Sequence, residues 1–486
     1  MIKLSDFFSR LAWQRHRHLY LTLIVALVYF LLHFCLRLWV SPALERDEAE
    51  QAVLAQHFAL GYGTQPPLYT WLQMLFFAIF GTHLATLLFF KTTLLFLLTV
   101  FFFLIAKETL LDEELAMLAT ASLAFLPQIA WEGQRDLSHT VLATMMGAAL
   151  LFSFFCFYNK PSFGRSIALG LCVGLGFLSK YNIVFLQAGL ALATLATPQA
   201  RRLLLEHKNH VKTIALTAFC VILPHLVWLL LHHFESQALI KEIGIQNTAI
   251  APWKSMVEAF YTLFLFLTPF WFFFSVSFFK NIHLRFTTSK SRLLGSALLA
   301  CFFTLEVFMV VAGMIKLKPR WFDPLFFAMP IVFFAFVHKP LATWSKKLYL
   351  GIFILTITGY LIGMPTRVIL SQNHGRFEEL NAPVDQWVQA IAAAGFEKGL
   401  IIAESQWLAG NLKIYFPESH AYPAWADIQI KEPQSILVVW CNKPLPEKLE
   451  HQMKNLGYDL TEPQYIETPV LYGKGGMTLG MAFAKK

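Results

Sequence analysis

Residues 19–40 read LYLTLIVALVYFLLHFCLRLWV, and residues 41–50 read SPALERDEAE. A helix needs about 20 apolar residues to cross a bilayer, so the first stretch predicts a membrane span. Charged groups close to the hydrocarbon layer are costly and tend to be functional. The acids that follow therefore indicate a polar site at the membrane surface where this span ends.

The rest of the chain has the composition of a polytopic membrane protein. Hydrophobic residues make up 57% and charged residues 14%, whereas soluble domains carry about 25% charge. This composition excludes a disordered chain and a set of soluble domains. Together with residues 19–40, apolar runs predict about 11 transmembrane helices; the others lie near 84–106, 115–131, 139–158, 166–179, 182–198, 212–231, 259–279, 293–315, 323–338 and 348–368.

The positions of the cations predict how the chain is oriented. Most Lys and Arg of the short loops fall on the side of the N-terminus, and the positive-inside rule then makes that side cytoplasmic. An odd number of spans puts the C-terminus on the outer side. The net charge of +9 does not indicate a nucleic-acid partner, because the basic residues form no stripe. The exceptional cations of the outer loops are candidates for binding an anion: Arg46, Arg135, Lys180, Lys241, Lys254, Lys316, Lys318 and Arg320.

Residues 371–486 change in character to a mixed polar and apolar tail, which is long enough for one small domain. A helix is expected from Pro383 to Ala394, ending at Gly395, and β-type runs lie at 399–403, 435–440 and 477–484. We therefore predict a transmembrane domain at 1–370 and a small soluble α/β domain at 371–486 on the periplasmic side.

Two groups of acids lie in loops of the outer side. Glu45-Arg46-Asp47-Glu48 follows the first span, and Asp136 lies in the turn before the fourth. Each has a structural alternative: acids at 45–50 could cap an interfacial helix over 51–58, and Asp136 could cap the fourth helix. If the two loops converge, one carboxylate could take the proton of an acceptor hydroxyl while the other orients a partner.

Two groups of cations lie on the same side. Lys180 and Tyr181 interrupt an apolar region, where a lone lysine could simply extend to the interface. Residues 316–324 read KLKPRWFDP, which could be an aromatic anchor or a phosphate clamp, since Arg offers a bidentate fork and Lys a point charge.

Together these motifs resemble the GT-C membrane glycosyltransferases. The features are an Asp-Glu pair after the first span, a Pro-Pro-Leu about 20 residues later, an Asp opening the fourth span, GLGFLSKY at 174–181 and a Lys-Pro-x-Trp outer loop. The chain is most similar to the protein O-mannosyltransferase-like group that includes the lipid A aminoarabinose and lipopolysaccharide galacturonosyl transferases. The resemblance covers about residues 1–370.

The resemblance implies a bacterial inner-membrane enzyme that passes a sugar from a polyprenyl-phosphate donor to a lipid, glycan or protein acceptor at the periplasmic face. Asp47 matches the catalytic acid, Glu48 its partner and Asp136 the second acid. Donor phosphate or substrate binding is expected from the membrane-proximal pair and the outer cations, namely Arg46, Lys180, Tyr181, Lys318, Arg320 and Trp321. Departures from the family pattern at Ala49, Gln65 and Arg135 concern the identity of the sugar and acceptor.

Three alternatives remain open at this stage. A transporter or flippase of lipid-linked sugars would need charges at mid-membrane and broken helices in paired positions, and apart from Lys91 and Glu306 the spans are almost free of charge. An oligosaccharide ligase or polymerase would share the lipid-linked donor. A divalent metal could assist transfer, with Asp47, Glu48, Asp136, His57 and His139 as candidate ligands, although their spacing does not establish a site.

Overall fold

The computed structural model describes residues 16–232, 252–314, 317–371, 378–426, 435–442 and 444–485. The chain divides into two compact units. The first contains residues 1–30, 59–69 and 93–358, and the second contains residues 31–58, 70–92 and 359–486. Helices α2 (Arg17–Val40), α5 (Leu84–Leu110) and α18 (Thr343–Ile369) each contribute to both units.

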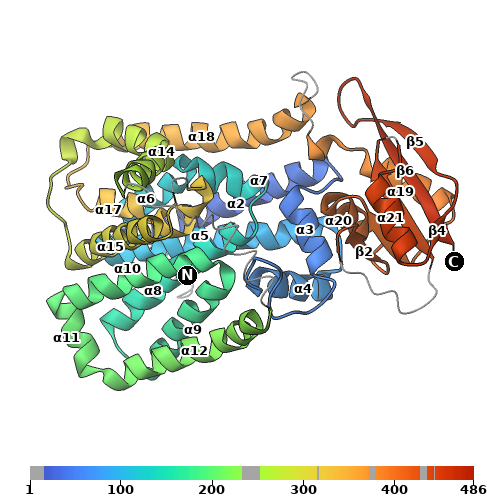
Figure 1. Ribbon diagram of the computed structural model, residues 1–486. Helices are drawn as coiled ribbons and strands as arrows, with labels where there is room; N and C mark the ends of the chain where they lie inside the picture. Colours follow the sequence, from blue (N-terminus) through green and yellow to red (C-terminus); the bar gives the residue numbers. More distant parts are fainter. Residues whose placement is uncertain are drawn as a thin grey trace, which may run out of the picture. The chain divides into compact units, whose positions relative to one another are not determined.

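The first unit is helical throughout its described part. Its helices after α5 are α6 (Glu113–Ala121), η1 (Ser122–Phe125), η2 (Gln128–Glu132), α7 (Gly133–Arg135), α8 (His139–Asn159), α9 (Phe163–Ser179), η3 (Tyr181–Ile183), α10 (Val184–Ala196), α11 (Pro198–Glu206), α12 (Lys208–Leu231), α14 (Pro252–Phe278), η4 (Phe279–Asn281), α15 (Ser289–Val311), η5 (Pro319–Trp321), α16 (Asp323–Phe326) and α17 (Met329–Phe334). α9 and α12 lie side by side, as do α10 and α15 (Figure 1). A Cβ at Gly189 would lie 2.5 Å from the backbone nitrogen of Cys301, so glycine allows α10 and α15 to touch.

The polytopic fold is confirmed, but the count of about 11 spans is not. Among the described residues, 7 helices are long and apolar enough to cross a membrane, or up to 9 if each bent pair is one span. One bent pair, 113–125 with 128–135, turns by 71° where Pro127 interrupts the chain, because proline cannot donate a backbone hydrogen bond. Three apolar helices are shorter, and one of these, α4 (Leu68–Phe80), lies where no span was predicted.

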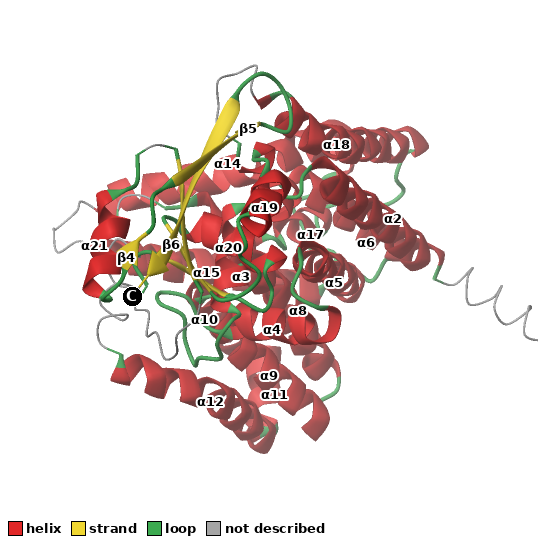
Figure 2. Ribbon diagram, turned by 90° about the vertical axis from the view of Figure 1, so that its right-hand side faces the viewer, coloured by secondary structure: helices red, strands yellow, loops and turns green. Residues whose placement is uncertain are grey.

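The second unit contains the sheet of the C-terminal region. Its elements are α3 (Arg46–Leu54), most of α4, η7 (Glu379–Asn381), α19 (Val384–Ala393), β1 (Leu400–Ala403), α20 (Gln406–Tyr415), β2 (His420–Pro423), β3 (Ile436–Cys441), α21 (Glu447–Asn455), β4 (Asp459–Leu460), β5 (Gln464–Pro469) and β6 (Gly476–Lys485). The strand order is β2-β1-β3-β6-β4, with β5 also paired to β6. β1 runs parallel to β2 and β3, and β6 runs antiparallel to its neighbours. Figure 2 shows β5 beside β6.

The sheet is covered by helices on both faces. Ile401 and Leu437 face α19 and α20, whereas Ile402 and Val438 face α21, so successive residues of each strand enter opposite apolar cores. The predicted α/β character is therefore confirmed, as are the helix after Pro383 and the strands β1, β3 and β6. The predicted boundary at residue 370 stays a prediction.

The second unit also joins the acidic stretch after the first span to the C-terminal region. Leu44 N–H donates to Asn411 Oδ1 at 2.8 Å, and Trp407 Nε1–H donates to the Leu44 carbonyl at 2.7 Å. A Cβ at Gly410 would lie 2.2 Å from the carbonyl oxygen of Ala49, so only glycine allows α20 to approach α3 this closely. These contacts hold α3 against α20.

Candidate active site

The predicted catalytic pair Asp47-Glu48 lies in the first turn of α3, which follows Glu45 as its N-cap. Backbone N–H groups at a helix start have no partner within the helix, and the helix dipole favours acids there. The Glu45 N–H donates to Oε2 of Glu48 at 3.0 Å. The acids at 45–50 thus stabilise a helix, as the structural alternative required, and this helix begins earlier than residue 51.

Glu48 is buried, and both of its oxygens are paired. Arg37 Nη2 lies 3.0 Å from Oε2, and Lys91 Nζ lies 2.9 Å from Oε1. Burial by itself would raise the pKa of the Glu48 carboxyl, but the charges of Lys91 and Arg37 outweigh it and lower this pKa to about 2. Glu48 is therefore an anion at neutral pH and has the geometry of a residue that holds α3 in place.

Asp47 and Arg46 are more accessible than Glu48. Asp47 is half-buried, and Arg46 is exposed with its Nε 2.5 Å from Oε1 of Glu379. Asp47 directly precedes Glu48 in α3. The catalytic role of Asp47 and the phosphate-binding role of Arg46 stay predictions.

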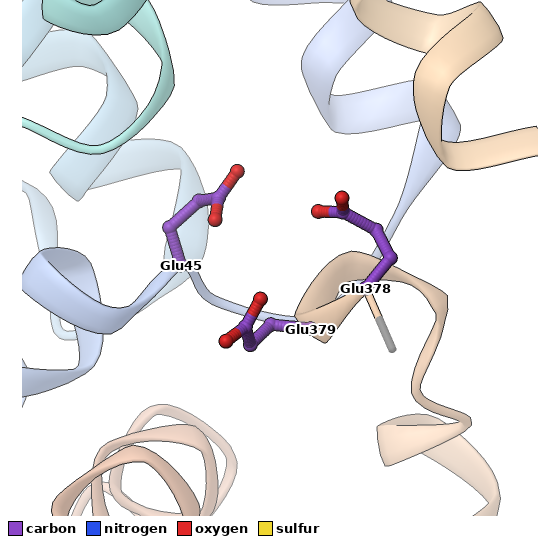
Figure 3. Close-up of side chains that lie close together, drawn as sticks. All are labelled: Glu45, Glu378 and Glu379. Atoms are coloured by element: carbon purple, nitrogen blue, oxygen red, sulfur yellow. The ribbon is translucent and has the colours of Figure 1, made fainter. Parts of the chain in front are cut away.

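Three carboxylates of the second unit lie close together around Arg46 and Arg367. Ligand atoms of Glu45, Glu378 and Glu379 all lie within 4.8 Å of one another, and Figure 3 shows them turned toward a common region. Arg367 Nη2 pairs with Glu45 and lies 3.5 Å from Glu378. Because two guanidinium groups offset most of the negative charge, the arrangement fits an ion-pair network, and we assign no metal to it.

The candidate metal ligands suggested by the sequence are a different set. Within the described residues, Asp47, Glu48, Asp136, His57 and His139 do not come together as a group that could hold a metal ion.

Asp136 lies in the first unit, between α7 and α8. It is half-buried, and its backbone N–H donates to the Glu132 carbonyl at 3.1 Å. The N-cap of α8 is Ser138, so Asp136 is not the cap that the structural alternative proposed. Asp47 and Asp136 belong to different units, and their convergence stays a prediction.

Lys180 and Tyr181 follow the end of α9. Lys180 Nζ donates to Oγ1 of Thr140 at 2.6 Å, in the first turn of α8. The Tyr181 hydroxyl lies 2.9 Å from Nε2 of His225, and Nδ1 of His225 lies 2.6 Å from the Leu60 carbonyl. The lysine therefore reaches another helix, and the tyrosine is linked through a histidine to the stretch before the Pro-Pro-Leu motif.

The cationic loop at 317–324 contacts the Lys180 segment. Lys318 is exposed, whereas Arg320 and Trp321 are partly buried. Nδ2 of Asn182 donates to the Trp321 carbonyl at 3.0 Å. The structure thus brings together two motifs that are 139 residues apart. The donor-binding role of Lys180, Tyr181, Lys318, Arg320 and Trp321 stays a prediction. Lys316 lies outside the described residues.

Four residues near these motifs were not predicted as site residues. They are Thr140, which accepts from Lys180; Asn182 and Asp323, which are buried at the junction with the cationic loop; and Arg37, which pairs with Glu48. For Asn182 and Asp323 the sequence signal is that each is a polar residue within or next to a predicted motif. Arg37 could have been noticed as a charge inside an apolar run.

Comparisons with known proteins agree with this architecture. The family described as dolichyl-phosphate-mannose-protein mannosyltransferase matches residues 64–228. The lipopolysaccharide core galacturonosyltransferase RgtB of Rhizobium johnstonii is 30% identical over 470 residues, which cover 92% of this chain and 93% of RgtB. RgtA of the same organism, also a lipopolysaccharide core galacturonosyltransferase, is 26% identical over 94% of this chain and 95% of its own.

The similarity to RgtB over nearly the whole of both chains shows that this chain belongs to the same family, the GT-C membrane glycosyltransferases. It is therefore an enzyme that transfers a sugar, and the transporter alternative falls away. The fold agrees: the crystal structure of ArnT from Cupriavidus metallidurans bound to undecaprenyl phosphate matches with a TM-score of 0.58 at 12% identity, over 95% of this chain and 97% of ArnT. The apo ArnT structure matches with a TM-score of 0.61.

Proposed function

We propose that this glycosyltransferase moves galacturonic acid from an undecaprenyl-phosphate donor to the core or lipid A part of lipopolysaccharide. The observation that carries the proposal is the 30% identity to a lipopolysaccharide core galacturonosyltransferase across nearly the whole of both chains. The donor is suggested by the undecaprenyl phosphate bound to ArnT, which shares the fold. The reaction would take place at the periplasmic face of the inner membrane, with the N-terminus in the cytoplasm, because the loops carrying the proposed site lie on the side with fewer cations.

The proposed reaction is one displacement at the anomeric carbon. A lone pair of the acceptor hydroxyl forms the new C1–O bond while the bond from C1 to the donor phosphate oxygen breaks. The hydroxyl proton passes to Asp47 as general base, and the leaving group departs as polyprenyl phosphate. One displacement inverts the configuration at C1. Asp136 would orient the acceptor or the sugar.

Cations would stabilise the phosphate charge as it develops. Stabilising such charge in a partly dry site is usually the largest catalytic contribution. Lys180, Arg320 and Lys318 are assigned to the phosphate in this proposal, with Arg46 as a further cation and Tyr181 and Trp321 lining the substrate. Glu48 is assigned a positioning role, since both its oxygens are already bound to Arg37 and Lys91.

The test is transfer by purified protein in nanodiscs. Synthetic polyprenyl-phosphate galacturonate is supplied with lipopolysaccharide from a strain that lacks the gene, and product and released polyprenyl phosphate are measured by mass spectrometry. We expect both in equal amounts. Polyprenyl-phosphate aminoarabinose serves as the competing donor. Transfer from that donor alone would replace galacturonate in the proposal, and release of neither product would contradict it.

A further inference from the structure

Two buried oxygen atoms of the first unit accept no hydrogen bond from any residue that the structure describes. They are Oδ1 of Asp323, a residue that is 2% exposed, and Oδ1 of Asn182, which is 6% exposed. Buried polar atoms in native proteins almost always have a partner, which can be protein, water or a ligand. Two unpaired acceptors at one place therefore call for a donor that none of the described residues supplies.

These two acceptors belong to one junction. Asp323 begins α16, and α16 packs against η3, which contains Asn182. The other end of the Asn182 amide is held, because its Nδ2 donates to the carbonyl of Trp321, two residues before Asp323. With the nitrogen held there, the amide oxygen is kept in a defined direction as an acceptor.

The junction lies beside the cations of the proposed donor site. The positive charges of Lys180 and Arg320 attract Asp323, and the negative charge of Glu132 repels it. A metal ion would be disfavoured at this junction because the positive charges of Lys180 and Arg320 would repel it. A neutral group that carries O–H donors suits these acceptors better.

We propose that Asp323 and Asn182 form a sugar-hydroxyl subsite that binds hydroxyl groups of the donor's sugar ring. This inference rests on the proposed function, since it needs a phosphate-linked sugar as donor. Such a donor joins both kinds of group in one molecule: a phosphate for Lys180 and Arg320, and ring hydroxyls for the two buried acceptors. The subsite would make Asp323 and Asn182 specificity-determining residues.

Deoxy donors distinguish this role from a purely structural one. A site built to bind a hydroxyl rejects an analogue that lacks it, because the buried partner is then left unpaired. The 2-, 3- and 4-deoxy analogues of polyprenyl-phosphate galacturonate are compared with the full donor by kcat/KM. For the wild type we expect at least one analogue to be worse by roughly 100-fold or more.

The variants Asp323→Ala and Asn182→Ala should lose this discrimination. Each should use the full donor poorly and the corresponding deoxy donor about equally well, so that the ratio falls to within about threefold. Asp323→Asn keeps an acceptor oxygen and should retain part of the difference in kcat/KM between the full and the deoxy donor, which covers the case in which the alanine variant does not fold.

Glu306→Gln is the matched control, because Glu306 is another buried carboxylate of the described chain without a hydrogen-bond partner. Its ratio of kcat/KM between the two donors should equal that of the wild type.

The subsite would be overturned if Asp323→Asn and both alanine variants kept the wild-type ratio of kcat/KM between the full donor and every deoxy donor. These variants would also have to show normal unfolding temperatures. In that case the wild type still transfers the full donor, so the proposed function stands. A wild type that does not use the full donor at all would overturn the proposed function and the subsite together.

Discussion

Glu48 and Lys91 are 43 residues apart in the chain, and Nζ of Lys91 donates a hydrogen bond of 2.9 Å to Oε1 of Glu48. Arg37 donates to the other oxygen from the end of α2. The same guanidinium also donates to the carbonyls of Ser41 and Ala43, at 3.0 and 2.7 Å. One buried network therefore joins α2, α3 and α5 next to Asp47, and it explains why a charge is kept at the end of one span and inside another.

Removing the anion from this network should destabilise the protein strongly. Glu48→Gln leaves the cations of Arg37 and Lys91 buried without a counter-charge, which costs about 3–5 kcal/mol of unfolding free energy. The measurement is thermal unfolding in detergent. Glu450→Gln is the control, because it breaks an exposed ion pair with Lys454 in α21 and should leave the unfolding temperature unchanged. Equal unfolding temperatures for Glu48→Gln and wild type would contradict a stabilising network.

The same network predicts an acid dependence of stability. The pKa of Glu48 is about 2 in the folded protein and 4.5 in its ordinary range, so folding favours the charged form. The stabilisation is present in full above pH 4.5 and is lost as the pH falls toward 2. The difference in unfolding free energy between wild type and Glu48→Gln should therefore shrink from pH 5 to pH 2. A difference that grows with acid would show that this carboxyl is protonated in the folded state.

Much of the architecture could be predicted from the sequence. Long apolar runs are a local signal of membrane spans. The apolar stretches of β1 and β3 indicate strands in the same way, and the Pro and Gly on either side of α19 indicate where that helix begins and ends. The 13-residue helix α4 was missed because it is shorter than a bilayer-spanning helix. The bends between helix pairs depend on tertiary packing as well as on proline.

The partners of the site residues were less accessible to sequence reasoning. The site motifs themselves stand out because charge is rare in this chain. Which charge pairs with which depends on contacts between distant segments, such as Arg37 with Glu48 or Asn182 with the Trp321 carbonyl. Asp323 lies within the quoted cationic loop, yet its burial results from the packing of α16 against η3 and α8, which no local pattern predicts.

Replacing cations of the outer loop should weaken use of the donor. If Lys318 and Arg320 bind the donor phosphate, Lys318→Gln or Arg320→Gln removes a charge-assisted contact worth about 1.5–3 kcal/mol, and kcat/KM should fall by about 10- to 150-fold. Donor titration with purified protein measures this. Lys398→Gln is the control and should keep wild-type kinetics, since Lys398 is an exposed cation that pairs with Glu418 at 3.7 Å and belongs to no proposed site. Wild-type kinetics in both variants and in their double variant would remove this loop from the site.

Reporter fusions test the orientation in the membrane. A reporter that is active only outside the cytoplasm should be active when fused after Lys486 and silent when fused within residues 279–292. The reason is the excess of loop cations on the predicted cytoplasmic side. The opposite pattern would place the acids of α3 and the C-terminal region in the cytoplasm, where the proposed lipid-linked donor would not be required.

The most direct test of the proposed chemistry is single-turnover transfer by Asp47→Asn. The purified variant, in nanodiscs with saturating polyprenyl-phosphate galacturonate and lipopolysaccharide acceptor, is compared with wild type and with Glu50→Gln as a control in the same helix. We expect Asp47→Asn to fold and insert normally and to release polyprenyl phosphate about 10²–10⁴-fold more slowly, the range for general acid–base groups, while the control keeps the wild-type rate. A rate for Asp47→Asn above about a third of wild type would contradict the assignment of Asp47 as the catalytic base.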